Sequence, residues 1–170
     1  SNINYINLPT SINTINDNAF SNCEFLLHIN IPTSVTDIYN NAFSNCTSLL
    51  TIDIPLSIQT IGQFAFSNCE LLHTFNISSD VSINIINKEV FAQCYNLTSI
   101  IIPDSVTTID DKAFYDCSSL LAINIPSSVI NINISAFSNC IKISTIPSSS
   151  DLNPYAKNCS FISFTSFILS

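Results

Sequence analysis

The sequence predicts a repeat solenoid, which is a stack of short β-strands joined by turns around one continuous apolar core. Three observations predict this fold class: cysteines recur about every 23 residues, aliphatic residues recur in register between them, and prolines follow at a fixed distance. A constant period of this length is typical of repeat proteins, in which each unit buries its apolar side against its neighbours.

The cysteine spacing defines the repeat. The motif AFSNC occurs four times, close copies read VFAQC and AFYDC, and a cysteine ends each one. Successive cysteines are separated by 23, 23, 25, 23, 23 and 19 residues. We therefore expect about seven repeats, with two extra residues between Ser78 and Asn87 and a short last copy that ends at Cys159. The extra residues are expected to disturb the stack locally.

A short strand is expected after each cysteine. Apolar residues lie six and eight positions later, as at Ile29 and Ile31, and a period of two is typical of a strand with one buried face. A β-branched pair such as Val35 and Ile38 then predicts a second extended segment. Proline lacks an amide donor and ends the first strand of four repeats. These prolines are Pro32, Pro55, Pro103 and Pro126.

A sharp corner is expected directly after the second extended segment, because most residues there tolerate a left-handed backbone. These residues are Asn16, Tyr39, Gly62, Asn87, Asp110 and Asn133. The alanine and phenylalanine of each motif then fit a single turn of helix or 3-10 helix. We expect the phenylalanine to fill the core and the cysteine to begin the turn into the next strand.

The segment CTSLLTIDIPLSIQTIGQFAFSNC and its sister copies resemble the BspA-like leucine-rich repeat family. The family unit runs Cys, Leu, Ile-x-Ile-Pro, Val, Ile-Gly, Ala-Phe, Cys, and the resemblance extends from Ile3 to about Cys159. It implies one leucine-rich-repeat domain over residues 1–170. That domain is a right-handed stack, mostly β with short helical or 3-10 turns. Two departures are that the family glycine survives only at Gly62 and that Ala156 replaces the usual phenylalanine.

Charge and hydropathy limit the partners. Four basic residues against twelve acidic ones give a net charge of -8, the wrong sign for neutralising phosphates, so we expect no nucleic-acid partner. No apolar run is long enough to span a bilayer, so we expect no membrane insertion in this segment. The chain starts without methionine or a signal peptide. We expect it to be a fragment of a longer chain, whose flanking domains or neighbouring subunits cover the ends of the stack.

The cysteines leave three states open: reduced thiols in the core, disulfides between neighbouring repeats, and metal binding. There is no Cys-x-x-Cys pair, and equivalent residues in stacked repeats have parallel side-chain vectors that do not favour a disulfide. Buried thiols pack as small hydrophobes, so we expect a structural core ladder and no cofactor or metal. The ladder residues are Cys23, Cys46, Cys69, Cys94, Cys117 and Cys140.

No pattern of catalytic residues is present. His28 and His73 occupy different columns of the repeat and are expected to face solvent, and neither HExxH nor GxSxG occurs. We therefore expect a protein that is not an enzyme. Four aspartates cluster in one repeat. We expect them to form turns, and calcium binding is the alternative. These aspartates are Asp104, Asp110, Asp111 and Asp116.

One exposed row is the candidate interaction face. It lies seven residues after each cysteine, between two inward-facing positions, and Ile101 interrupts it. Its polar members are Asn7, Asn30, Asp53, Asn76 and Asn124. Two explanations stay open: the row is an amide ladder that stabilises stacked strands, or it binds a partner protein through many polar contacts.

The family resemblance implies a non-enzymatic protein-interaction module that acts in surface adhesion or host-matrix binding. A protein of this kind is expected at the cell surface or in the secreted fraction. The alternative is an intracellular structural scaffold or assembly component, which suits reduced cysteines and the missing signal peptide. In either case the expected partner is another protein.

Overall fold

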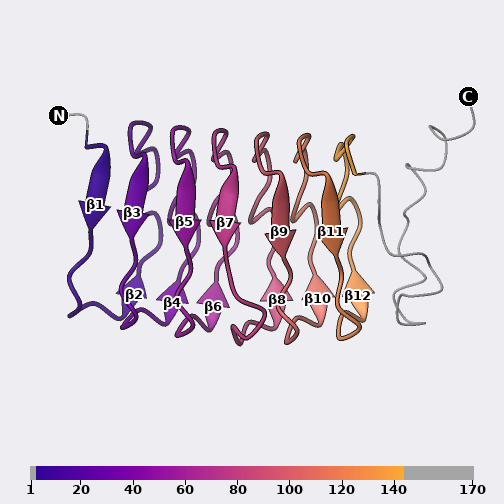
Figure 1. Cartoon of the computed structure of the whole chain (residues 1–170), viewed down its shortest axis with the longest axis horizontal. Coiled ribbons are helices and arrows are strands. Elements are labelled where there is room, and N and C mark those ends of the chain that lie inside the picture. Colours follow the sequence, from indigo (N-terminus) through magenta and orange to yellow (C-terminus); the bar gives the residue numbers. More distant parts are fainter. Residues whose placement is uncertain (1–2, 144–170) are drawn as a thin grey trace, which may run out of the picture.

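The computed structural model describes residues 3–143, which form a solenoid whose successive turns stack through parallel β-strands (Figure 1). Within this range, each repeat contributes one three-residue strand and one two-residue strand. The three-residue strands are β1 (Tyr5–Asn7), β3 (His28–Asn30), β5 (Thr51–Asp53), β7 (Thr74–Asn76), β9 (Ser99–Ile101) and β11 (Ala122–Asn124). The two-residue strands are β2 (Thr14–Ile15), β4 (Asp37–Ile38), β6 (Thr60–Ile61), β8 (Ile85–Ile86), β10 (Thr108–Ile109) and β12 (Asn131–Ile132).

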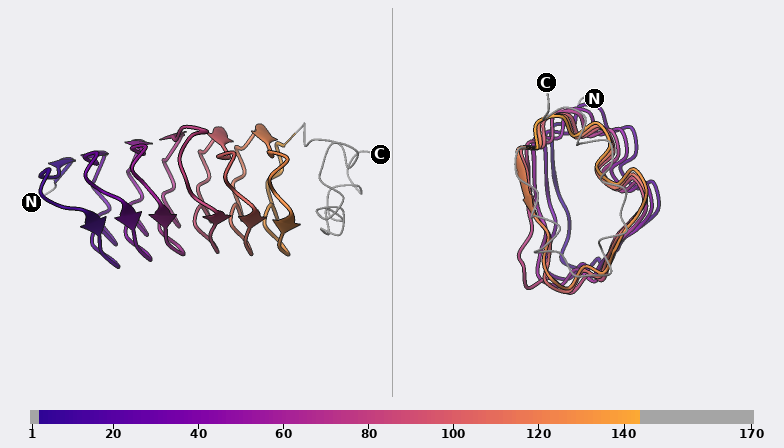
Figure 2. Two further views of the ribbon diagram at one scale, coloured as in Figure 1. Left: turned by 90° about the horizontal axis from the view of Figure 1, so that it is seen from below. Right: turned by 90° about the vertical axis from the view of Figure 1, so that its right-hand side faces the viewer.

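These strands confirm the predicted solenoid. The three-residue strands form one six-stranded sheet in the order β1-β3-β5-β7-β9-β11. Pairing is parallel and joins residues one repeat apart, so Tyr5 pairs with His28. Viewed along its length, the described chain repeats one closed outline around the core (Figure 2). From residue 144 onward, the seventh copy, which ends at Cys159, lies outside the described residues.

The core repeats the same kinds of side chain at equivalent positions of the described turns, with few exceptions. The central residue of each three-residue strand faces inward, and the phenylalanine of each motif lies beneath the corner as predicted, with Phe43 and Phe66 fully buried. Neighbouring phenylalanine rings stack with centroids 5.1 to 5.9 Å apart. No polar or charged residue of the described range is buried. Stacking similar units therefore gives one continuous apolar core.

The corner prediction was wrong in position. None of the six residues that follow the second strand has a positive φ, because the left-handed residues lie two and six positions further on. They are Asn18, Asn22, Asn41, Asn45, Phe64, Asn68, Glu89, Gln93, Lys112, Asp116, Ser135 and Asn139. Asparagine, which tolerates this conformation better than most residues, holds six of these twelve positions.

Gly62 was expected to allow a left-handed backbone, but the structure uses it to allow a close approach between two turns. Its φ is not positive, but a Cβ at this position would lie 2.6 Å from the amide nitrogen of Asn40 and 2.7 Å from the carbonyl carbon of Tyr39. Glycine is therefore required at this point by the close approach of two successive turns.

The segment expected as a turn of helix or 3-10 helix is a run of hydrogen-bonded turns, and residues 3–143 contain no helix. Its amides alternate between two kinds of partner. The Ala19 amide donates to Asn16 O in its own turn at 3.1 Å, whereas the Phe20 amide donates to Ala42 O in the next turn at 2.8 Å. A 3-10 helix needs every amide for bonds within the turn. Bonding to the neighbouring turn therefore replaces the helix.

Candidate interaction face

The outer face of the six-stranded sheet carries the candidate row. Each of these strands alternates an outward, an inward and an outward residue, and the row consists of the last residue of each strand. All six of these residues are exposed: Asn7, Asn30, Asp53, Asn76, Ile101 and Asn124. Because the strands pair in register, the side chains form a line across the sheet.

Part of this row is hydrogen-bonded to itself. Asn30 Nδ2 donates to Asn7 Oδ1 at 2.8 Å, and Asn76 Nδ2 donates to Asp53 Oδ1 at 2.6 Å. These bonds are the amide ladder considered as one explanation of the row. They fix the orientation of the side chains, yet one face of each remains open to solvent. A fixed, exposed polar row is compatible with partner binding as well as with stabilisation.

The other outward row of this sheet is mixed. It begins with Tyr5 and continues through His28, Thr51 and Thr74. His28 Nδ1 lies 3.1 Å from Thr51 Oγ1, and the His28 side chain is exposed as predicted. His73 is also exposed and lies immediately before β7. The two histidines therefore belong to different columns of the repeat.

The two extra residues of the fourth repeat break the stack as expected. Between β7 and β9, strand pairing is reduced to Thr74 and Ser99, whereas β9 and β11 pair over three residues. The two-residue strands also divide at the fourth repeat, between β6 and β8, into the separate sheets β2-β4-β6 and β8-β10-β12. Asn87 Nδ2 donates to Ile61 O at 2.7 Å and replaces the amide that makes this bond in other repeats.

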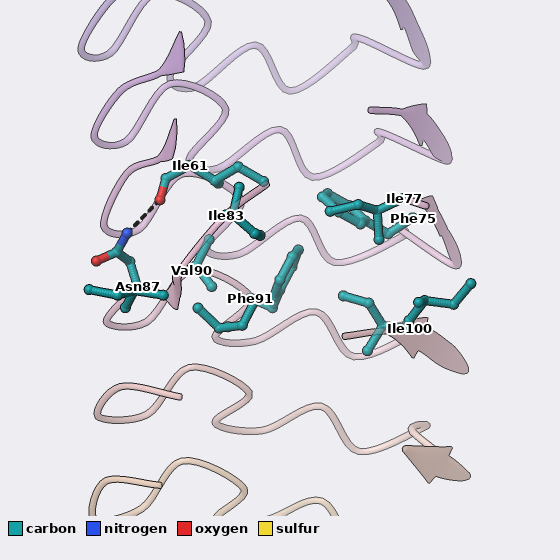
Figure 3. Close-up of a pocket in the computed structure, with 11 residues that line it drawn as sticks. Ile61, Phe75, Ile77, Ile83, Asn87, Val90, Phe91 and Ile100 are labelled. Atoms are coloured by element: carbon teal, nitrogen blue, oxygen red, sulfur yellow. Dashed lines mark hydrogen bonds between the residues drawn. The ribbon is translucent and has the colours of Figure 1, made fainter. Parts of the chain in front are cut away.

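Phe75 fills the interior of this break. It takes the place of the isoleucine found in the other repeats, and its ring lies edge-on to Phe66 and Phe91, with centroid distances of 5.1 and 4.7 Å. We call the interior of the break around Phe75 the seam. The side chains that line the seam are apolar apart from Asn87 (Figure 3). The seam leaves a free volume of about 10 Å³, too little for more than a single water.

An open groove lies above the break, on the outer face of the six-stranded sheet. Its volume is about 410 Å³, within the usual range for ligand sites. Phe75, Ile77 and Ile100 are buried side chains that line it, and Ile101, 54% exposed, stands at its edge. Asp53 and Asn76 of the candidate row also line the groove. The row and the groove therefore form one continuous surface.

The cysteine column is buried behind this surface. Cys46, Cys69, Cys94, Cys117 and Cys140 are fully buried, Cys23 in the first turn is partly exposed, and all six thiols are free. Each of the five buried thiols donates to the phenylalanine carbonyl of the previous repeat, as Cys69 Sγ does to Phe43 O at 3.2 Å. A structural role as hydrogen-bond donors is thus added to their packing role. Cys159 lies outside the described residues.

Burial makes these thiols weak acids. Desolvation raises the pKa of Cys46 and of Cys94 from 9.0 to about 12. Desolvation also raises the pKa of Cys69 and Cys117, with neighbouring cysteines of the column adding to the shift. The reactive thiolate is therefore suppressed at neutral pH. Among residues 3–143, no group of three or more His, Cys, Asp or Glu side chains could hold a metal ion.

Two aspartates of the acidic cluster in the fifth repeat accept hydrogen bonds from neighbouring residues and from the next turn. Asp110 Oδ1 accepts from the Asp111 amide at 2.7 Å and from Asn133 Nδ2 at 2.6 Å. Asp116 Oδ1 accepts from Asn139 Nδ2 at 2.7 Å. These contacts support turns and stacking, in agreement with the turn-forming explanation.

Comparison with known proteins identifies the repeat. The family model of the BspA type leucine-rich repeat region, in six copies, matches residues 1–84 and 84–169. The chain belongs to the BspA-type leucine-rich repeat family. A search of curated proteins found no match. Residues 3–143 also contain no helix long and apolar enough to cross a bilayer.

Several solved structures of bacterial proteins are similar to this fold. A leucine-rich repeat protein from Eubacterium ventriosum is 25% identical with a TM-score of 0.77, over 92% of this chain and 43% of its own length. A leucine rich cell surface protein from Faecalibacterium prausnitzii is 26% identical with a TM-score of 0.58, over 92% and 63%. The pneumococcal vaccine antigen PcpA is 27% identical with a TM-score of 0.66, over 74% and 31%. The chain spans less than two thirds of each of these structures.

Sequence reasoning found the row but missed the groove. The signals for the groove were present: two extra residues in one repeat, phenylalanine at Phe75 where the column otherwise has isoleucine, and an apolar Ile101 in a polar row. Their common location follows only from strand register, which places β7 and β9 side by side.

Proposed function

We propose that this BspA-type chain is a non-enzymatic protein-interaction module, and that it acts in adhesion or host-matrix binding at a cell surface or after secretion. The exposed polar row across the six-stranded sheet carries the proposal, because it is an extended line of hydrogen-bonding groups that only Ile101 interrupts within the described residues. Repeat stacks present such surfaces to macromolecules. The resemblance to a leucine rich cell surface protein and to a vaccine antigen supports the location.

The partner that we propose is a protein. A net charge of -8 disfavours phosphate-rich partners, and a polar row with few charges suits protein backbones and neutral side chains. We further propose that residues 1–170 form a single domain and that a flanking domain or neighbouring subunit covers its first turn. The support is that apolar residues of that turn, such as Ile6, Leu8 and Phe20, are only partly buried.

Antibody labelling of the source cells tests the location. Antibody raised against the 170-residue chain should label intact cells, and brief protease treatment of those cells should remove the signal. The alternative function, an intracellular scaffold, is favoured by the six free cysteines, since thiols persist in reducing compartments. Labelling that appears only after permeabilisation would support the scaffold and rule out surface adhesion.

A further inference from the structure

We propose that the groove between β7 and β9 binds a lysine or arginine side chain from an extended segment of a partner protein. This inference rests on the proposed interaction function and specifies the chemistry of one contact on the same face. Three features support it: the shape of the groove, its single uncompensated charge, and its continuity with the polar row.

The groove combines an apolar floor with a polar rim. Phe75, Ile77 and Ile100 line it with exposed fractions of 8% or less, and the exposed Ile101 extends the apolar surface on one side. Within residues 3–143, Asp53 is the only charged residue that lines the groove. A long basic side chain matches this arrangement, because its aliphatic stem can pack on apolar surface while its charged end reaches a carboxylate.

The Asp53 carboxylate is already oriented. Asn76 Nδ2 donates to its Oδ1 at 2.6 Å, so the Oδ2 atom is available to a further donor. Two lysines contact aromatic rings outside the groove: Lys88 Nζ lies 5.9 Å from the centroid of the Phe64 ring, and Lys112 Nζ lies 5.8 Å from that of the Tyr115 ring. No lysine of residues 3–143 lines the groove, so a cation from a partner would meet a negative charge that these residues do not compensate.

A protein segment fits better than other cationic ligands. The groove opens onto the outer face of the sheet and continues into the candidate row, so a chain lying along that row would carry one side chain into the groove. A bare metal ion would need several ligands, and Asp53 belongs to no group of potential metal ligands within residues 3–143. The neutral amides on either side favour hydrogen bonds with a peptide backbone.

The test is a nuclear magnetic resonance titration of the ¹⁵N-labelled 170-residue chain. The probe is a capped peptide of sequence Ser-Leu-Lys-Leu-Ser, and the comparison peptides carry norleucine or glutamate in place of lysine. We expect the lysine peptide at millimolar concentration to shift amide resonances of β5, β7 and β9, and to bind about five-fold more tightly than the norleucine peptide. The glutamate peptide should bind least, and added salt should weaken the lysine peptide most.

Two variants assign the effect to the groove. Asp53→Asn keeps the Oδ1 acceptor for Asn76 and should reduce the affinity for the lysine peptide to that for norleucine. Glu70→Gln removes the same charge at an exposed position outside the groove and should leave both affinities unchanged. Ile101→Asn restores the polar residue of the row and should weaken both peptides, because it removes an apolar wall.

The outcomes separate this inference from the proposed function. Absence of any shift at millimolar peptide, equal affinity for lysine and norleucine, or shifts located away from β5, β7 and β9 would each overturn the groove proposal. Surface labelling of intact cells could still succeed in those cases, so the interaction module would stand without this contact. Failure of surface labelling together with a lysine-selective groove would instead overturn only the proposed location.

Discussion

At the scale of single residues, the buried cysteines are hydrogen-bond donors with suppressed acidity. Cys69 Sγ donates to Phe43 O at 3.2 Å, and desolvation raises the Cys69 pKa above its ordinary 9.0. In the unfolded chain the same thiol ionises near 9.0. The unfolded state therefore binds fewer protons than the folded state above that pH, and stability falls as the pH rises. For Cys46 and Cys94 the window extends from 9.0 to about 12.

Cys69→Ala tests this account. At neutral pH it should lower the free energy of unfolding by about 1 to 3 kcal/mol, since Phe43 O loses its donor and a small cavity remains. Above pH 9.0 the variant should lose stability less steeply than the wild type, by about 1.4 kcal/mol per pH unit. Urea unfolding at neutral pH and at several alkaline pH values measures both effects.

Cys23→Ala, at a partly exposed position, is the control for the loss of stability at neutral pH. If the stability of Cys69→Ala and of the wild type fell equally steeply with alkaline pH, this would contradict the account.

The left-handed corner positions offer a stabilising substitution. Glu89 has a φ of 52°, a conformation that costs an ordinary L-residue about 1 to 2 kcal/mol and costs asparagine less. Glu89→Asn should therefore raise the free energy of unfolding by about 0.5 to 1 kcal/mol. Thermal unfolding measures the gain. Glu70→Asn, at an exposed position without a positive φ, should change stability by less than about 0.5 kcal/mol. Equal effects of the two variants would refute the assignment.

At the scale of elements, Phe75 compensates for the break between β7 and β9. Next to this break, the Phe66 and Phe91 rings are 5.9 Å apart across the gap between β6 and β8, compared with 5.1 Å between Phe43 and Phe66. Phe75 packs edge-on against both the Phe66 ring and the Phe91 ring. A larger side chain therefore occupies the one level at which the two-residue strands do not pair. The two extra residues of the fourth repeat widen the stack, and the phenylalanine at Phe75 fills the space that they create.

A reciprocal pair of variants tests this compensation. Phe75→Ile should destabilise the chain by about 1 to 3 kcal/mol, because isoleucine leaves a cavity in the seam. Ile52→Phe, the reverse change in the same column of the preceding repeat, should also destabilise by about 1 to 3 kcal/mol, because a regular turn has no room for the ring. Chemical denaturation measures both. A Phe75→Ile variant as stable as the wild type would show that the seam needs no filling.

At the scale of the whole molecule, regularity decided what could be predicted from sequence. The solenoid, its core phenylalanines and the buried cysteines follow from columns that repeat every 23 residues, because stacked identical units must bury identical positions. The left-handed corner at Asn18 could not be placed, since asparagine is present at several neighbouring positions and only the bonds between turns select among them. The groove was missed because it depends on the register of β7 and β9 across an irregular repeat.

We propose that adhesion or host-matrix binding takes place on the polar row of the six-stranded sheet. The most direct measurement is the binding of the 170-residue chain to a panel of purified extracellular-matrix proteins, repeated with the double variant Asn30→Lys and Asn124→Lys on the row. The matched control is Thr14→Lys and Asn131→Lys on β2 and β12. We predict that the wild type and the control capture the same matrix protein and that the row variant loses at least ten-fold in affinity, about 1.4 kcal/mol. Equal capture by all three chains, or capture of no matrix protein by the wild type, would contradict the claim.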